Sequence, residues 1–94
     1  MDIEQFKQEL AGEGYEVVTK TMEPNVRNEV HTHPFDVRLL VLSGEMSVAS
    51  EGRTTTCRSG DTFAMRAGCE HAESYGAEGA TYLVGRRQAT AAAA

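Results

Sequence analysis

Residues 25–44 read NVRNEVHTHPFDVRLLVLSG, and residues 60–71 read GDTFAMRAGCEH. These two stretches hold all three histidines of the 94-residue chain, His31, His33 and His71. His31 and His33 are two residues apart, so on a strand both side chains would point to the same face. A histidine from a distant strand could complete one face of a metal site, because imidazole nitrogen is a ligand for zinc, iron, copper and nickel. The two stretches therefore predict a transition-metal site.

The length and composition narrow the class of protein. A chain of 94 residues with 40% hydrophobic residues can form one domain with a modest core. A net charge of −5 argues against a nucleic-acid partner, which needs a basic surface. No apolar run reaches 18 residues, and the first 20 residues are acidic, so we expect neither a membrane span nor a secretory signal. Two cysteines, Cys57 and Cys69, are too few for a disulfide scaffold, which favours a reduced, cytoplasmic protein.

The hydrophobic pattern predicts one short helix followed by short strands. Asp2 can cap a helix over residues 3–11, with Ile3, Phe6 and Leu10 on one face and Gly12 or Gly14 at its end. The strands, separated by turns that mostly contain glycine, are expected at residues 15–22, 37–42, 45–49, 53–57, 62–65, 69–74 and 80–84. This spacing is typical of an all-β sandwich or barrel. We expect a single domain over residues 1–87, with the helix in 1–13 and the barrel in 15–85, followed by a disordered, alanine-rich tail over residues 88–94.

The first histidine stretch resembles a motif of the cupin family, in which a glycine precedes His-x-His by five residues, a glutamate follows, and a second glycine closes the motif. Asn25 stands in the first glycine position and can adopt the same turn geometry. His31 and His33 occupy the two histidine positions, and Gly44 closes the motif.

The second stretch is similar to the second cupin motif. Gly60 opens it, Arg66 stands at the proline position, and Gly68 and His71 match, while Tyr75 occupies the position of an asparagine. The resemblance implies a small, RmlC-like cupin barrel, also described as a double-stranded β-helix or jelly roll. It also implies one divalent metal ion (iron, zinc, nickel or manganese) held by His31, His33 and His71, and it favours a homodimer.

The glutamate position of the first motif holds Val37. Parity predicts that Val37, Leu39 and Val41 face inward, while Arg38 and Leu40 face outward. The outward Leu40 and Leu42 need cover, which the helix or a second subunit could supply. The arrangement resembles a subset of metallocupins, including certain thiol and diketone dioxygenases, that hold Fe(II) with three histidines and no carboxylate.

The strand after His71 offers further candidates at even spacing, namely Cys69, Glu73 and Tyr75. Glu73 could replace the missing carboxylate ligand, accept a hydrogen bond from an imidazole, or be an exposed strand residue. Tyr75 could donate to a bound oxygen species or form pocket wall. Cys69 could lie near the pocket mouth as a thiol, but we interpret it as a small buried residue. The predicted inward lining is Val37, Leu39, Val41, Phe63, Met65, Glu73 and Tyr75, a mostly apolar pocket for a small organic ligand.

Two functions follow from these residues. The first is an Fe(II)-dependent dioxygenase, or a related metalloenzyme, for a small chelating acid, thiol or diketone, with Glu73 and Tyr75 as catalytic residues that handle protons. The second is a non-catalytic cupin that binds a metal or a small ligand, as a sensor or regulator. A metal-free sugar isomerase would need a general base, and Glu73 is the only inward carboxylate available.

Overall fold

Two long antiparallel strands, β3 (Phe35–Ser50) and β6 (His71–Gln88), organise the fold. In a computed structural model that describes residues 2–88, they pair from Phe35 opposite Gln88 to Ser50 opposite His71. The strands bend together near Gly44 and Gly79, which adopt φ angles of +78° and +71°. A side chain at Gly44 would overlap the Gly79 carbonyl, and one at Gly79 would overlap the Met22 carbonyl, so both positions of the bend require glycine.

This continuity corrects two predicted turns. The turns expected at Ser43-Gly44 and at Glu78-Gly79 do not end strands, because pairing resumes on both sides of each bend with only a shift of register. Four predicted short strands are therefore the two halves of β3 and of β6.

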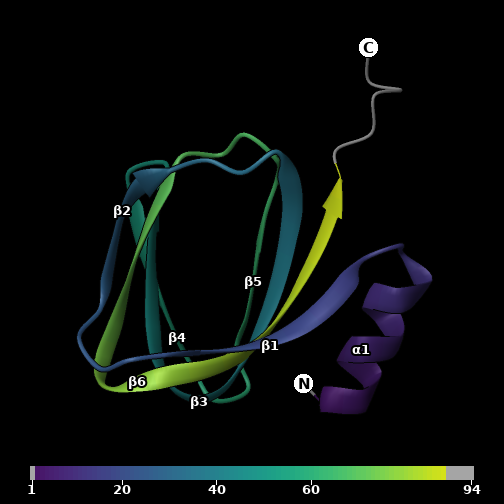
Figure 1. The fold of residues 1–94 in the computed structure, drawn as a ribbon, viewed down its shortest axis with the longest axis horizontal. Coiled ribbons are helices and arrows are strands. Elements are labelled where there is room, and N and C mark those ends of the chain that lie inside the picture. The colour runs from purple at the N-terminus through teal and green to yellow at the C-terminus, as the bar shows by residue number, and fades with distance from the viewer. Residues whose placement is uncertain (1, 89–94) are drawn as a thin grey trace.

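Four shorter strands complete the sheet. Strands β4 (Arg53–Arg58) and β5 (Thr62–Met65) pair with β3, and strands β1 (Glu16–Met22) and β2 (Arg27–His31) pair with β6. The turn between β3 and β4 is the predicted one, with positive φ at Glu51 and Gly52. Figure 1 shows these strands curling around a common interior. The predicted all-β barrel with a short N-terminal helix is confirmed.

The two faces of β3 bury different side chains, as parity predicts. Val37, Leu39 and Val41 are buried in the barrel interior with residues of β4 and β6. On the opposite face, Leu40 packs with Phe6 and Leu10 of helix α1 (Ile3–Gly12), so the helix supplies the cover.

Helix α1 lies outside the barrel, beside the sheet (Figure 1). The Asp2 side chain caps it by accepting a hydrogen bond from the Gln5 amide, and Gly14 follows it with a φ of +83°. Arg38 of β3 links this region to the sheet through ion pairs of 3.6 Å to Glu9 and 3.1 Å to Glu13. Ile3, expected on the buried face, is 42% exposed because it lies in the first turn, at the end of the contact.

The C-terminal boundary differs slightly from the prediction. Gln88, assigned to the tail, is the last residue of β6 and pairs with Phe35. The rest of the predicted tail, residues 89–94, lies outside the described residues. Within residues 2–88, no helix has the length and apolar character that a membrane span requires.

Candidate metal centre

The three histidines come together at one end of the barrel. His31 ends β2, His71 begins β6, and the two are directly paired in the sheet. His33 lies in the link from β2 to β3, where its carbonyl accepts a hydrogen bond of 2.8 Å from the Gly68 amide. This bond ties together the two sequence stretches that carry the histidines. The ring centroids of the three histidines lie 4.3 to 5.0 Å from one another.

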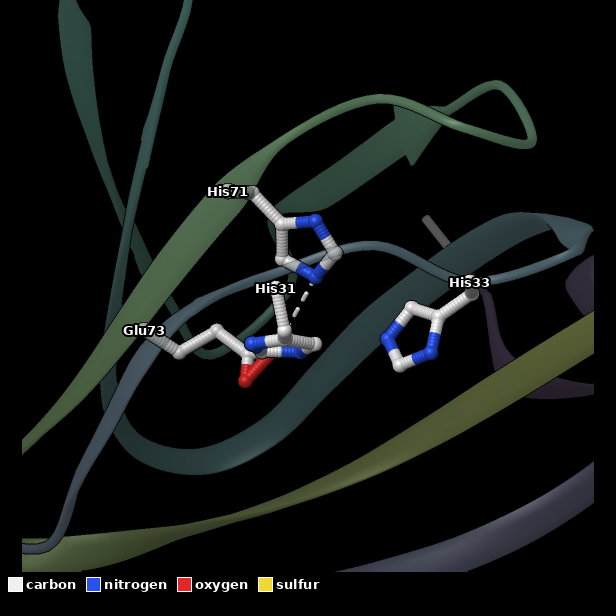
Figure 2. A group of neighbouring side chains, drawn as sticks. All are labelled: His31, His33, His71 and Glu73. Carbon is white, nitrogen blue, oxygen red and sulfur yellow. Dashed lines mark ion pairs between the residues drawn. The ribbon is translucent and has the colours of Figure 1, made fainter.

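Glu73 joins the histidines from β6, as Figure 2 shows. Its Oε1 atom lies 3.3 Å from Nε2 of His71 and 3.6 Å from Nε2 of His31. Its side chain is only 11% exposed. One ligand atom from each of His31, His33, His71 and Glu73 lies within 4.8 Å of the others, so these residues could hold a metal ion. The structure thus places Glu73 with the histidines, as its even spacing from His71 predicts.

Backbone carbonyls orient two of the imidazole rings. Nδ1 of His31 lies 2.6 Å from the Glu29 carbonyl, and Nδ1 of His71 lies 3.0 Å from the Cys69 carbonyl. A carbonyl only accepts, so in the neutral form of each ring Nδ1 carries the proton and Nε2 has a lone pair. The hydrogen bond to Nδ1 thus sets the nitrogen available to a metal.

In this neutral form, Nε2 of both rings and the carboxylate oxygen of Glu73 that faces them are all hydrogen-bond acceptors. Nε2 of His71 is buried and has no hydrogen-bond partner among the described residues. A lone pair directed at a carboxylate oxygen 3.3 Å away is unfavourable unless a cation or a proton lies between them. The four ligand atoms therefore fit a bound cation, both in their positions and in their charge.

Two groups support the second carboxylate oxygen of Glu73. Nδ2 of Asn28 donates a hydrogen bond of 3.0 Å to Oε2, and the Tyr75 hydroxyl donates to the same atom over 3.5 Å. Burial, followed by the contact with Tyr82, raises the pKa of Tyr75 far above its ordinary value, so the phenol keeps its proton. Tyr75 is 4% exposed and packs in the core.

His33 sits in a different environment from the other two histidines. Its ring stacks on Phe35 with a centroid distance of 4.8 Å. Burial lowers the pKa of His33, and the neighbouring His31 and His71 lower it further. The neutral form that this favours is the one that binds metal.

The predicted acid position is confirmed as apolar and inward. Val37 is 6% exposed and lines the cavity beside the histidines. Asp36 points elsewhere, because it accepts hydrogen bonds from the Ala67 amide at 2.9 Å and from Arg87 at 3.2 Å. These two bonds lower the pKa of Asp36.

A cavity of about 130 Å³ adjoins the metal-ligand group. It includes four of the predicted lining residues, Val37, Leu39, Met65 and Glu73. Three others lie elsewhere: Val41 and Tyr75 are in the core, and Phe63 lines a separate surface groove.

Several cavity residues were missed by the sequence reasoning: Lys20, Met22, Asn28, Phe35, Met46, Tyr82, Val84 and Arg86. The even spacing of Tyr82, Val84 and Arg86 on β6 was an available signal. Asn28 gave none, because it is three residues from His31 and a bulge in β2 between them changes the parity.

Cys69 is not the buried residue predicted. It is half-buried in the surface groove, with its sulfur 3.0 Å from the Ser50 hydroxyl. It precedes β6, so strand alternation does not apply to it. Cys57, by contrast, is 1% exposed in the core, where burial raises the pKa of its thiol.

Comparison with solved structures gives the same fold. A Rhizobium leguminosarum protein of unknown function superposes with a TM-score of 0.74 at 23% identity, over 80% of this chain and 71% of that chain. An RmlC-like cupin from Shewanella frigidimarina gives 0.71 at 18% identity, over 86% and 72%. KdgF from Halomonas sp. gives 0.72 at 16% identity, over 86% and 74%. Likeness at these identities shows the fold alone.

Sequence comparison supplies the family. Among curated proteins no match was found. A family model described as a cupin domain matches residues 18–84, which is more than half of the chain and includes all three histidines and Glu73. The protein belongs to the cupin family.

Proposed function

We propose that this cupin binds one divalent transition-metal ion through His31, His33, His71 and Glu73. The observation that carries the proposal is the convergence of their ligand atoms within 4.8 Å. The unpartnered Nε2 of His71 supports it, because a metal ion would satisfy that buried lone pair. Three imidazoles and one carboxylate suit iron, zinc, nickel or manganese.

Glu73 replaces the carboxylate that Val37 does not provide. It comes from β6, whereas the family motif places its glutamate on the strand that follows the His-x-His pair. A carboxylate as buried as that of Glu73 is costly to ionise unless a cation or hydrogen-bond donors compensate. Asn28 and Tyr75 supply the donors on one oxygen, and the metal supplies the cation on the other.

We propose further that the centre is catalytic, as an Fe(II)-dependent dioxygenase or a related metalloenzyme for a small chelating organic substrate. Bound iron would act as a Lewis acid and a meeting point for substrate and O₂. The support from this chain is the adjoining cavity, whose wall combines apolar side chains with polar ones that could orient a ligand. Glu73 would hold the iron through Oε1, and Tyr75 acts through Glu73 by donating a hydrogen bond to its other oxygen, Oε2.

A non-catalytic metal-binding or ligand-binding role is the alternative. The cytoplasmic location and the homodimer also stay part of the proposal, and size-exclusion chromatography with light scattering tests the dimer. Because helix α1 already covers Leu40, that residue gives no separate argument for a second subunit.

Elemental analysis of anaerobically purified protein tests the metal site. We expect about one metal ion per chain, lost in His71→Ala and kept in Glu45→Gln, which changes a carboxylate on β3 that pairs with Arg58. A wild-type protein that binds no added Fe(II), Zn(II), Ni(II) or Mn(II), or a His71→Ala variant that keeps wild-type affinity, would contradict the site. Oxygen uptake by the iron-loaded protein with small hydroxy acids, keto acids, thiols and diketones then separates the catalytic role from the binding role.

A further inference from the structure

The cavity beside the metal-ligand group contains two cationic side chains that the metal site does not use. Lys20 of β1 and Arg86 of β6 line it together with Val37, Tyr82 and Glu73. Both cations are exposed, so they stand at its open side. The whole chain has a net charge of −5, so this pair is a local exception to the overall charge.

No carboxylate neutralises either cation. Within residues 2–88, neither Lys20 nor Arg86 has an acidic group within ion-pair distance. Glu16 is opposite Arg86 in the sheet register but forms no ion pair with it. Glu73, the acid in the cavity lining, has both oxygens engaged, one facing the histidines and one accepting from Asn28 and Tyr75.

Stacked rings hold the guanidinium of Arg86 close to the metal-ligand group. Its central carbon lies 5.3 Å from the centroid of the Phe35 ring. The other neighbour of Phe35 is His33, with the two rings stacked at 4.8 Å and 15°. Arg86 is thus one aromatic ring away from a metal-ligand candidate, and the contact with Phe35 limits the freedom of its long side chain.

We infer that Arg86 and Lys20 form a carboxylate-binding subsite, so that the ligand of this cavity is a small organic carboxylate whose other end reaches the metal. The inference rests on the proposed metal function and adds the substrate class. A guanidinium can bind a carboxylate through two parallel hydrogen bonds, and an ammonium in the same cavity lining adds a point charge. A cavity of about 130 Å³ has room for about four water-sized groups, which favours a small acid.

Calorimetric titration of glycolate into the Zn(II)-loaded full-length protein tests this subsite. Glycolate carries a carboxylate and a metal-chelating hydroxyl, and glycolamide is the uncharged analogue of equal size. We expect glycolate to bind at least about tenfold more tightly than glycolamide. We also expect Arg86→Gln to remove that preference while Zn(II) affinity stays within about threefold of wild type. Lys20→Gln should weaken glycolate by a smaller factor, because it removes one point charge.

The matched control is Arg53→Gln, which removes the same charge from an exposed arginine outside the cavity lining. The subsite would be overturned if the wild type bound glycolate and glycolamide equally well. It would also be overturned if Arg86→Gln kept the preference for glycolate, or if Arg53→Gln lost that preference and Arg86→Gln did not. If the wild type binds no metal, the proposed function fails separately. In that case, glycolate is titrated into the metal-free protein, and the amide and side-chain NMR signals of Lys20 and Arg86 are followed. Shifts of these signals would support the subsite, and unchanged signals would contradict it.

Discussion

Nδ2 of Asn28 lies 3.0 Å from Oε2 of Glu73, and this hydrogen bond sets which carboxylate oxygen faces the histidines. With Oε2 held by Asn28, Oε1 is directed at Nε2 of His71 and His31. The two residues are also direct partners in the pairing of β2 with β6, so the backbone register supports the side-chain contact. The orientation of the proposed fourth ligand therefore depends on a residue within the first histidine stretch at a position that the motif does not specify.

Replacing Asn28 with alanine should weaken metal binding without unfolding the protein. Loss of a group that orients a ligand typically reduces metal affinity by about 10- to 100-fold. We expect that loss for Zn(II) in Asn28→Ala, measured by competition with a chromophoric chelator. Arg27→Gln, one residue earlier on β2 and outside the cavity lining, is the control and should bind Zn(II) normally. Equal affinity in Asn28→Ala and wild type would show that Glu73 needs no such support.

A carboxylate at position 37 should replace Glu73 but not add to it. Val37 is buried in the wall beside the histidines, where a glutamate would approach the same ion. We expect Glu73→Gln to lower Zn(II) affinity by about tenfold or more, and Val37→Glu to restore most of it in that background. In the wild type, Val37→Glu should give little gain because two carboxylates in one site repel each other. Additive effects of the two changes would mean that the carboxylates do not share one ion.

The paired tyrosines predict how stability depends on alkaline pH. Burial raises the pKa of Tyr75 and of Tyr82, whose hydroxyls lie 3.4 Å apart, above the ordinary value of 10.0. In the unfolded chain these phenols ionise near pH 10, whereas the folded protein keeps their protons. The unfolded state then binds fewer protons, so the free energy of unfolding should fall as the pH rises above 10. Urea unfolding between pH 8 and 11 should show this slope, and Tyr75→Phe should reduce it. A slope unchanged in both Tyr75→Phe and Tyr82→Phe would contradict the assignment.

The helix should contribute to stability mainly through one aromatic side chain. Phe6 is fully buried against Leu40 and Leu83 of the sheet, so Phe6→Ala leaves a cavity and should cost about 3 kcal/mol in urea unfolding. Ile3→Ala is the matched control, because Ile3 lies on the same helix but is 42% exposed. This change should lower the free energy of unfolding by less than about 1 kcal/mol. Similar losses in both variants would indicate that the helix is not docked as described.

Much of this fold could be predicted from local sequence, because local rules decide it. Asp2 marks the start of the helix, Glu51-Gly52 forms the hairpin turn, and alternation on β3 separates inward Val37 from outward Arg38. Period-two geometry likewise puts Glu73 on the same side of β6 as His71. Each of these depends on residues that are neighbours in sequence.

Only the tertiary structure decided the rest, because it depends on pairing between distant segments. Gly44 and Gly79 look like turn residues, but each lies at a bend inside a long strand where a distant backbone carbonyl, that of Gly79 or of Met22, leaves no room for a side chain. Asn28 reaches Glu73 because a bulge in β2 reverses the parity that sequence spacing implies. Arg86 enters the cavity because Phe35, far away in the chain, provides the ring on which it rests. A contact of this kind has no local pattern, since its energy appears only when two distant strands are brought side by side.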